Sequence, residues 1–343
     1  MISTLTFKDR LARLMHRAGL RRCRVFGETL NEYVARYHAE AESGRRRTQK
    51  GTRFSPGTIR SIKMAMVQLE GFQKWKGRVY GWDEIDFVFR ATFLDYLYEV
   101  RKYNVNSAAK CINTLVTIMA AAHAEGYHGN TVFLSRKFKA RRIEVDNVYL
   151  TKEELERFRS VDLSGLPALY EHARDIFLVG VYTAQRVSDY NYIDERNIIR
   201  SEGGEMVISL RQKKTGVWVS IPVKKELEEI LRKYELRLPH VVEQTFNRYI
   251  KVVARLAGID EPVTVRKSRC GVPMEETKPK YELVHSHTAR RTGATLMFLA
   301  GMNPFNICAM TGHSSIAMLR RYIKADKLER ARLIRSDEGF ARW

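Results

Sequence analysis

The chain has 343 residues, and its 60 Lys and Arg against 39 Asp and Glu give a formal net charge of +21 at pH 7. The length suggests two domains, and an apolar content of 44% excludes a disordered chain. The charge predicts a polyanionic partner. Nucleic acid is favoured over a membrane surface, because clustered Lys and Arg displace counterions from a phosphate backbone. The four cysteines have no disulfide or metal-ligand spacing, and no apolar run reaches about 18 residues, so we expect a cytoplasmic protein without a membrane segment.

The first half of the chain predicts helices only. Residues 1–27 form a basic N-terminal extension that lacks the apolar segment of a secretion signal, and a helical domain is expected over 28–134. Ser55 is expected to cap its first clearly periodic helix, and Asn106 and Gly126 to begin and end its last. The periodic helices are predicted over about 55–75, 91–103 and 106–126.

Two basic segments are candidates for nucleic-acid contact: the loop 44–53 and the linker 135–148. A charge run is ordinarily a solvated loop or linker, but in a chain this basic it also suits a phosphate backbone. Both explanations stay open for each segment. The candidate binding residues are Arg45, Arg46, Arg47, Arg136, Lys137, Lys139, Arg141 and Arg142.

The second half, 149–343, predicts mixed structure. Thr151 and Glu154 form a capping box at its first helix. Alternation around a Lys-Thr-Gly turn predicts a β-hairpin over 205–223, and turn residues between 262 and 285 favour a further short hairpin. The helices are predicted over about 149–158, 169–190, 224–235, 241–257, 288–300, 304–311 and 314–334, the last of which contains Tyr322.

Two cationic residues in this half are placed for chemistry on a phosphate. Arg186 ends an apolar helix, where a guanidinium is unusual in a core but can bind two phosphate oxygens, and Asp189 one turn later could hold it. Lys214 lies on the hairpin turn, from which a lysine can protonate a leaving oxygen, and Lys213 is its rival. Each taken singly has an ordinary explanation, as a helix-end ion pair or a surface lysine.

Two further pairs complete the candidate set. His287 and Arg290 are three residues apart on one helical face, and His313 precedes Tyr322 by nine residues. No Cys, Asp or Glu joins His285 and His313 at metal-ligand spacing, so no metal is expected.

Together these residues supply what a tyrosine nucleophile needs. A phenol with a pKa of about 10 must lose its proton as it attacks. The charge of a phosphodiester must be held by fixed cations and donors, and its leaving oxygen needs a proton. The set that meets these needs without a cofactor is Arg186, Lys214, His287, Arg290, His313 and Tyr322.

The order and spacing of this set resemble the tyrosine recombinase (phage-type integrase) family. The family's arginine, lysine, His-x-x-Arg and Gly-His-Tyr boxes are similar to TAQRVSD, QKKTGVWVSIP, HTARRT and TGHSSIAMLRRY. YLTKEEL resembles the opening of its catalytic domain, and residues 28–134 its SAM-like core-binding domain. The departures are Ala184 in place of a glycine, Ala289 and Arg291 beside Arg290, and Ala317 and Met318 before the tyrosine.

The resemblance implies a mainly α chain with a small β-hairpin or sheet element. It implies a two-domain C-shaped clamp made of a helical core-binding domain and a mixed α+β catalytic domain. Tyr322 would attack the scissile phosphate to give a 3′-phosphotyrosyl link, and Lys214 would protonate the leaving 5′ oxygen. Arg186 and Arg290 would hold the phosphate. His287 would assist the nucleophile, His313 would hydrogen-bond the phosphate and Asp189 would support the site, with neither ATP nor Mg²⁺.

The implied partners are double-stranded DNA with specific recombination sites, further copies of the chain in a homotetramer on paired sites, and an accessory directionality factor. The implied role is integration or excision of a mobile element or phage, with a bacterial or phage origin. Residues 1–27 would bind arm-type sites or be only a basic extension. Two alternatives stay open, a type IB-like topoisomerase and a non-catalytic regulator with a helix-turn-helix over 303–323.

Overall fold

The computed structural model describes residues 28–143 and 147–336, and the chain divides into two compact units. Unit 1 comprises Met1–Val145 with Arg266–Glu275, and unit 2 comprises Asp146–Val265 with Glu276–Trp343. Each unit has its own apolar core. The expected basic extension, 1–27, lies outside the described residues. Among the described residues, no helix combines the length and apolar character needed to cross a bilayer.

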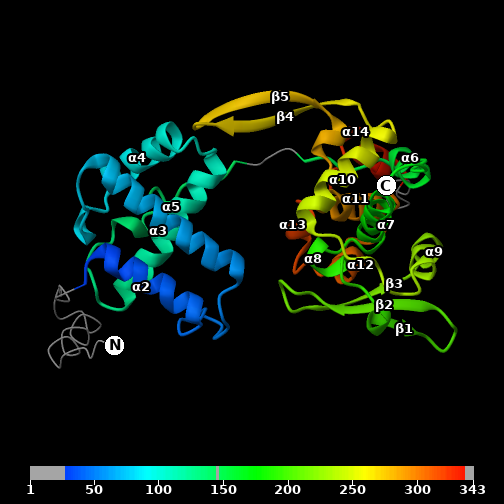
Figure 1. Cartoon of the computed structure of the whole chain (residues 1–343), viewed down its shortest axis with the longest axis horizontal. Coiled ribbons are helices and arrows are strands. Elements are labelled where there is room, and N and C mark those ends of the chain that lie inside the picture. The colour runs from blue at the N-terminus through cyan, green and yellow to red at the C-terminus, as the bar shows by residue number, and fades with distance from the viewer. Residues whose placement is uncertain (1–27, 144–146, 337–343) are drawn as a thin grey trace. The chain divides into compact units, whose positions relative to one another are not determined.

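Unit 1 is a helical bundle (Figure 1). Its core is rich in aromatic residues. Phe72 lies at its centre, with ring centroids 5.0 Å from Phe93 and 5.4 Å from Phe89. Ser55 caps α3 as predicted, by accepting the backbone N–H of Thr58. The elements are α2 (Leu30–Ser43), α3 (Pro56–Lys76), η1 (Trp82–Glu84), α4 (Phe87–Asp95), the π-helical turn η2 (Tyr96–Val100), α5 (Val105–Ala124) and η3 (Val132–Leu134).

The predicted cap of the last helix in this bundle was wrong by two residues. Asn104, not Asn106, caps α5 by accepting the backbone N–H of Ser107. The Asn106 side chain instead bonds to both the N–H and the C=O of Ile143. Its amide therefore fastens the segment after the bundle to the start of α5.

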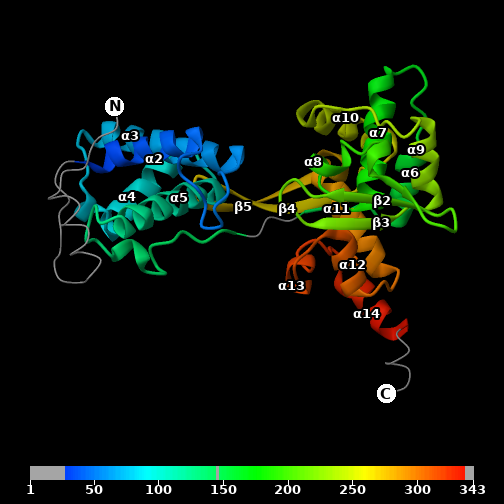
Figure 2. The same ribbon diagram turned by 90° about the horizontal axis from the view of Figure 1, so that it is seen from below.

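Unit 2 is built on α7 (Ala168–Thr183), which is buried on all sides from Asp175 to Val181, and α11 (Ser286–Leu299), which packs closely against it. A Cβ added at Gly293 would lie 2.1 Å from the backbone oxygen of Val181, so only glycine permits this approach. Figure 2 shows α11 between α7 and α10 on one side and α12 to α14 on the other. The remaining helices are α6 (Lys152–Ser160), α8 (Val187–Tyr190), η4 (Glu195–Asn197), α9 (Lys225–Lys233), α10 (Glu243–Leu256), η5 (Lys280–Leu283), α12 (Pro304–Thr311), α13 (Ile316–Leu319) and α14 (Lys327–Ser336).

Two antiparallel sheets accompany these helices. The first has the order β1 (Ile198–Arg200), β2 (Met206–Arg211) and β3 (Trp218–Pro222), with Ile208 opposite Ile221. It contains the predicted hairpin and one strand that was not predicted. The second pairs β4 (Pro262–Arg269) with β5 (Val272–Pro279), which are longer than the short hairpin expected. The mainly helical fold with small sheets is thus confirmed.

Two predicted helices are interrupted. The helix over 169–190 ends at Thr183, because Ala184 adopts the left-handed conformation (φ 50°) and the Gln185 side chain donates to the carbonyl of Thr183. This is the position at which the family usually has glycine, the residue that adopts a positive φ most easily. The break turns the chain toward α8 and places Arg186 at its N-terminus.

The helix over 314–334 is likewise two helices, with Tyr322 in the turn between them. The hydroxyl of Thr295 on α11 donates to the Tyr322 carbonyl and accepts the N–H of Lys324, bonds that a continuous helix would make internally. Asp326 then starts α14 by accepting the N–H of Glu329. The expectation of a tyrosine within a helix was therefore wrong.

Candidate active site

The first turn of α11 carries the His-x-x-Arg pair. His285 caps this helix through a ring nitrogen that accepts the N–H of His287, 3.2 Å away. Arg290, one turn later, is completely buried, and its Nη1 donates to the Ala184 carbonyl at 3.0 Å. Its Nη2 lies 2.9 Å from both the Thr311 carbonyl and the Nε2 of His313. Arg290 therefore connects the ends of α7 and α12.

The hydrogen bonds around His313 fix its tautomer. Arg290 can only donate, so the Nε2 of His313 accepts. Thr311 donates its hydroxyl to the Ile307 carbonyl, so its oxygen accepts the Nδ1–H of His313 at 2.7 Å. Burial, followed by the charge of Arg290, lowers the pKa of His313 to about 3. The imidazole is neutral at physiological pH.

Tyr322 lies against this cluster and is half-buried. Its ring centroid is 4.5 Å from the ring of His313 and 5.8 Å from that of His287. The guanidinium carbon of Arg290 lies 5.1 Å from the Tyr322 centroid. Burial, with a smaller effect of Arg291, lowers the pKa of His287 to about 4, so this imidazole is also neutral. The phenol of Tyr322, the neutral imidazoles of His287 and His313 and the buried guanidinium of Arg290 thus lie close together.

Arg186 and the hairpin turn flank the cluster. The Nη1 of Arg186 donates to the Oε1 of Gln212 at 3.0 Å. Asp189 does not hold Arg186 as expected; its Oδ1 accepts the backbone N–H of Lys213 at 2.9 Å. Lys213 and Lys214 are both exposed on the turn, and the ammonium of Lys213 lies 3.3 Å from the Tyr192 ring centroid.

The structure therefore brings four of the six predicted catalytic residues into contact: His287, Arg290, His313 and Tyr322. Arg186 lies close enough for its charge to lower the pKa values of Arg290 and His313, in both cases after burial. Lys214 shares the hairpin turn with Gln212, the partner of Arg186, but touches none of the other five.

Two arginines of this site, Arg290 and Arg291, have lowered pKa values, chiefly because they are buried. Burial and then Arg186 lower the pKa of Arg290 to about 10, and burial lowers that of Arg291 to about 10. The Nε of Arg290 is buried and makes no hydrogen bond within the described part of the chain. Among the same residues, no group of three His, Cys, Asp or Glu side chains is placed to hold a metal ion. The arrangement suits an anion with several oxygen acceptors.

Two residues of the site, Gln212 and Arg291, were not predicted from the sequence. Gln212 continues the buried face of β2, where alternation after Ile208 and Leu210 calls for an apolar side chain. A glutamine at a position where an apolar residue is expected was the feature of the sequence that could have identified Gln212 as a site residue. Arg291 has its Nη1 3.2 Å from the Nε2 of His285 and was noted only as a departure from the family pattern.

The basic candidates in unit 1 divide into two groups. Arg46 forms ion pairs with Glu40 and Glu125 and lies over the Tyr37 ring, 4.3 Å from its centroid. Its guanidinium therefore stabilises the bundle, which corrects its assignment to the DNA-binding set. Seven others are exposed: Arg45, Arg47, Arg136, Lys137, Lys139, Arg141 and Arg142.

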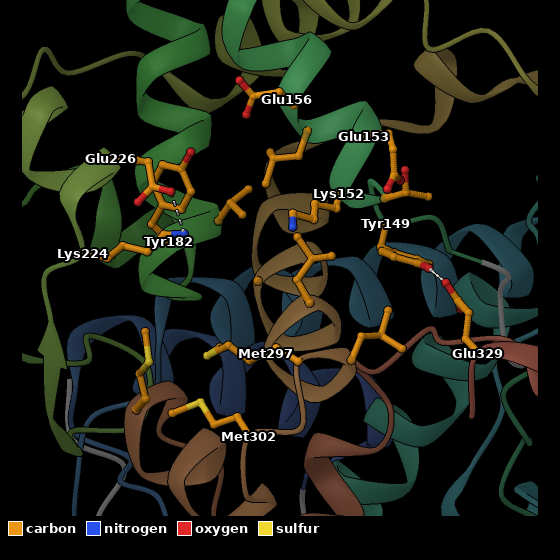
Figure 3. Close-up of a pocket in the computed structure, with 18 of the residues that line it drawn as sticks. Tyr149, Lys152, Glu153, Glu156, Tyr182, Lys224, Glu226, Met297, Met302 and Glu329 are labelled. Carbon is orange, nitrogen blue, oxygen red and sulfur yellow. Dashed lines mark hydrogen bonds and ion pairs between the residues drawn. The ribbon is translucent and has the colours of Figure 1, made fainter. Parts of the chain in front are cut away.

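A separate pocket of about 840 Å³ lies in unit 2 (Figure 3). Its lining is apolar around Met297 and Met302, with charged residues such as Lys152 and Glu156 at its edge. Tyr149 hydrogen-bonds to Glu329 of α14 beside it. None of the six predicted catalytic residues lines this pocket.

Comparison with protein families gives two matches. Residues 148–329, more than half of the chain, match the phage integrase family, and residues 29–140 match the phage integrase SAM-like domain. The chain belongs to the phage integrase family. It is a site-specific tyrosine recombinase, an enzyme that cleaves and rejoins DNA, which confirms the resemblance of its motifs. The match over 148–329 includes every predicted catalytic residue of this integrase.

Solved structures of other recombinases share the fold of this integrase. A lambda integrase dimer bound to a COC′ core site has a TM-score of 0.58 and 20% identity, covering 94% of this chain and 82% of that chain. The Tn1549 transposon integrase in complex with transposon right end DNA has a TM-score of 0.61 and 16% identity, covering 92% and 100%. XerH recombinase bound to a palindromic difH substrate has a TM-score of 0.59 and 14% identity, covering 96% and 94%. Comparison with curated protein sequences gives no significant match.

The helix-turn-helix alternative fits this geometry poorly. In the segment 303–323, α12 is followed by α13, which has only four residues. A recognition helix must be long enough to present several side chains to base edges in the major groove. Tyr322 and His313, both within this segment, instead face Arg290.

Proposed function

We propose that this integrase cleaves DNA by attack of the Tyr322 hydroxyl on a scissile phosphate, which forms a 3′-phosphotyrosyl link and releases a 5′-hydroxyl. The observation that carries the proposal is the contact of the Tyr322 ring with His313 and His287, beside the buried guanidinium of Arg290. A nucleophilic phenol needs a base and a fixed positive charge at the phosphate, and these neighbours supply both.

The proton balance assigns the remaining roles. His287 is neutral in the free protein and can accept or relay the phenolic proton as the oxygen attacks phosphorus. Arg186 and Arg290 neutralise the non-bridging oxygens, and a phosphate oxygen would give the Nε–H of Arg290 the acceptor that it lacks. His313 would donate to a phosphate oxygen from its Nε2, which must first gain a proton, and the bound anion favours that proton because it offsets the charges of Arg290 and Arg186 that lower the pKa of the ring in the free protein. Rejoining is the reverse reaction, in which the 5′-hydroxyl displaces Tyr322.

Lys214 is the proposed acid for the leaving 5′ oxygen. Lys213 has its ammonium against the Tyr192 ring, so its side chain already has a partner, and its backbone N–H is held by Asp189. Lys214 is exposed on the same turn and is free to reach a bound strand. Asp189 then supports the site by fixing the turn rather than by binding Arg186.

The wider function is integration or excision of a mobile element or phage, on double-stranded DNA with specific sites. The net charge of +21 and the exposed cations of 135–148 support this partner. We propose a core-binding domain at 28–134, a catalytic domain at 149–343 and the basic linker between them. Because lambda integrase is known as a tetramer bound to a Holliday junction, we propose four protomers on paired sites. We also propose that residues 1–27 bind arm-type sites and that an accessory directionality factor takes part. The proposed location is the cytoplasm of a bacterial host.

Covalent trapping tests the reaction. Singly nicked duplexes drawn from the DNA that flanks the gene are incubated with the protein in excess EDTA, and adducts are counted on denaturing gels. Wild type should form adducts, because side chains rather than a metal hold the phosphate. Tyr322→Phe should bind the same duplexes and form none. Adducts that vanish with EDTA and return with Mg²⁺ would contradict the mechanism.

A further inference from the structure

Gln212 is completely buried beside the active site, and all four hydrogen-bonding positions of its amide are occupied. Its Nε2 donates to the Oε1 of Gln185 at 2.7 Å and to the Thr311 carbonyl at 2.8 Å. Its Oε1 accepts the Nη1 of Arg186 at 3.0 Å and the hydroxyl of Thr215 at 2.7 Å. One amide therefore joins the arginine box, the lysine hairpin and the end of α12.

The surroundings leave this amide one orientation. Gln185 donates its own Nε2 to the carbonyls of Thr183 and Met310, so its oxygen is turned toward Gln212. Gly312, between Thr311 and His313, has φ 68°, and a Cβ there would lie 2.5 Å from the Nε2 of Gln212. The glycine thus lets the loop before His313 close over the amide.

We propose that Gln212 is a positioning residue that aims Arg186 at the scissile phosphate and aligns it with the hairpin turn of Lys214 and the loop of His313. The inference rests on the proposed roles of Arg186 and Tyr322. Gln212 touches none of the reacting atoms; it acts by fixing the groups that do.

The choice of an amide has a chemical reason. A carboxylate at this position would also accept from Arg186, but it would neutralise the charge that the phosphate needs. Its second oxygen would face the Thr311 carbonyl and the Gln185 oxygen, two acceptors with no proton between them. A neutral amide holds Arg186 by one bond and leaves its charge available.

The variant Gln212→Glu tests whether the neutral amide positions Arg186. In single-turnover trapping at about pH 8, the variant should cleave about 10²-fold more slowly than wild type with little change in DNA affinity, because Arg186 is misplaced and partly neutralised. We expect burial and the two facing acceptors, the Thr311 carbonyl and the Gln185 oxygen, to raise the pKa of this carboxyl more than the single bond from Arg186 lowers it, so that at about pH 5 the protonated group donates to Thr311 and still accepts from Arg186. The ratio of variant to wild-type rate should rise at least about tenfold over this range, a rescue that a merely structural defect does not predict.

Two further variants sharpen the test. Gln244→Glu introduces the same charge on the exposed face of α10 and should match wild type at both pH values. In an Arg186→Lys background, Gln212→Glu should slow cleavage much less than in wild type, because both changes affect one group. If Gln212→Glu does not fold, Gln212→Met takes its place, with slow cleavage, no pH rescue and the same lack of additivity expected.

The outcomes separate this inference from the proposed function. Wild-type adducts together with a Gln212→Glu rate equal to wild type, or a rate deficit that is constant with pH, would overturn the positioning role alone. A wild type that forms no adduct would overturn the proposed function and the inference that rests on it. The thermal midpoint of free Gln212→Glu should also be lower at about pH 8 than at about pH 5, relative to Gln244→Glu; equal midpoints would contradict the bonding described here.

Discussion

Arg290 shows how a buried charge is kept ready for a ligand. Its guanidinium is fully buried, yet its partners are two backbone carbonyls and a neutral imidazole rather than a carboxylate. Such bonds fix the geometry without cancelling the charge, and the cost of burying it appears as a lowered pKa, about 10. A bound phosphate is the counterion that would offset this cost.

The catalytic roles of the two neighbouring lysines, Lys214 and Lys213, can be distinguished by experiment. Lys214→Ala should slow cleavage by about 10²–10⁴-fold, the usual range for loss of a general acid, with little loss of DNA binding. On a duplex whose scissile 5′ oxygen is replaced by sulfur, the rate should largely recover, because a thiolate leaves without a proton. Lys213→Ala is the matched control and should show no selective recovery. Recovery in Lys213→Ala instead would transfer the acid role to that residue.

Among the elements, two helix starts with a local cap were predicted correctly and one, at Asn104, was misplaced by two residues, whereas the helix breaks that tertiary contacts decide were not predicted. Ser55 and Thr151 cap their helices as expected, through bonds within one turn. The break at Ala184 depends on Met310, and the turn at Tyr322 depends on Thr295, each of them distant in sequence. Periodicity within a segment carries no signal for such contacts.

The packing of α7 against α11 gives the element-scale prediction. Gly293→Ala should destabilise unit 2 by about 1–3 kcal/mol, because the new methyl group would meet the backbone of Val181 and force the helices apart. Cleavage should fall as well, since Arg290 lies one turn earlier on α11. Gly57 in α3 is the control: its added methyl group would meet only the Ser55 hydroxyl, at an ordinary contact distance of 3.9 Å, so Gly57→Ala should change stability by less than about 0.5 kcal/mol. Urea unfolding measures both; equal effects would contradict the close approach.

For the whole molecule, the chemistry of the residues together with the resemblance of the motifs to the family predicted a set of six catalytic residues between 186 and 322. Four of the six meet in one cluster. The hydrogen-bond partner of each residue could not be predicted from the sequence. Asp189 was assigned to Arg186 by spacing, yet it holds the backbone of Lys213, because the break at Ala184 turns α8 toward the hairpin.

The high positive charge of the chain predicts that its DNA affinity depends strongly on salt concentration. Replacing the five exposed linker cations (Arg136, Lys137, Lys139, Arg141 and Arg142) with alanine should weaken DNA binding and reduce the slope of log K against log salt by about four. Arg46→Ala should leave the slope unchanged and destabilise unit 1, because its guanidinium is paired with Glu40 and Glu125. Binding titrations at several salt concentrations measure the slopes. An unchanged slope in the linker variant would mean that these residues are only solvated.

The identity of the residue that carries the DNA tests the central claim most directly. Wild-type adducts on nicked duplexes are digested with protease and nuclease, and the peptide that retains a nucleotide is sequenced by mass spectrometry. The account predicts that the nucleotide is attached through its 3′ phosphate to Tyr322, the tyrosine in ring contact with both His313 and His287. Attachment to any other residue, or through a 5′ phosphate, would contradict it.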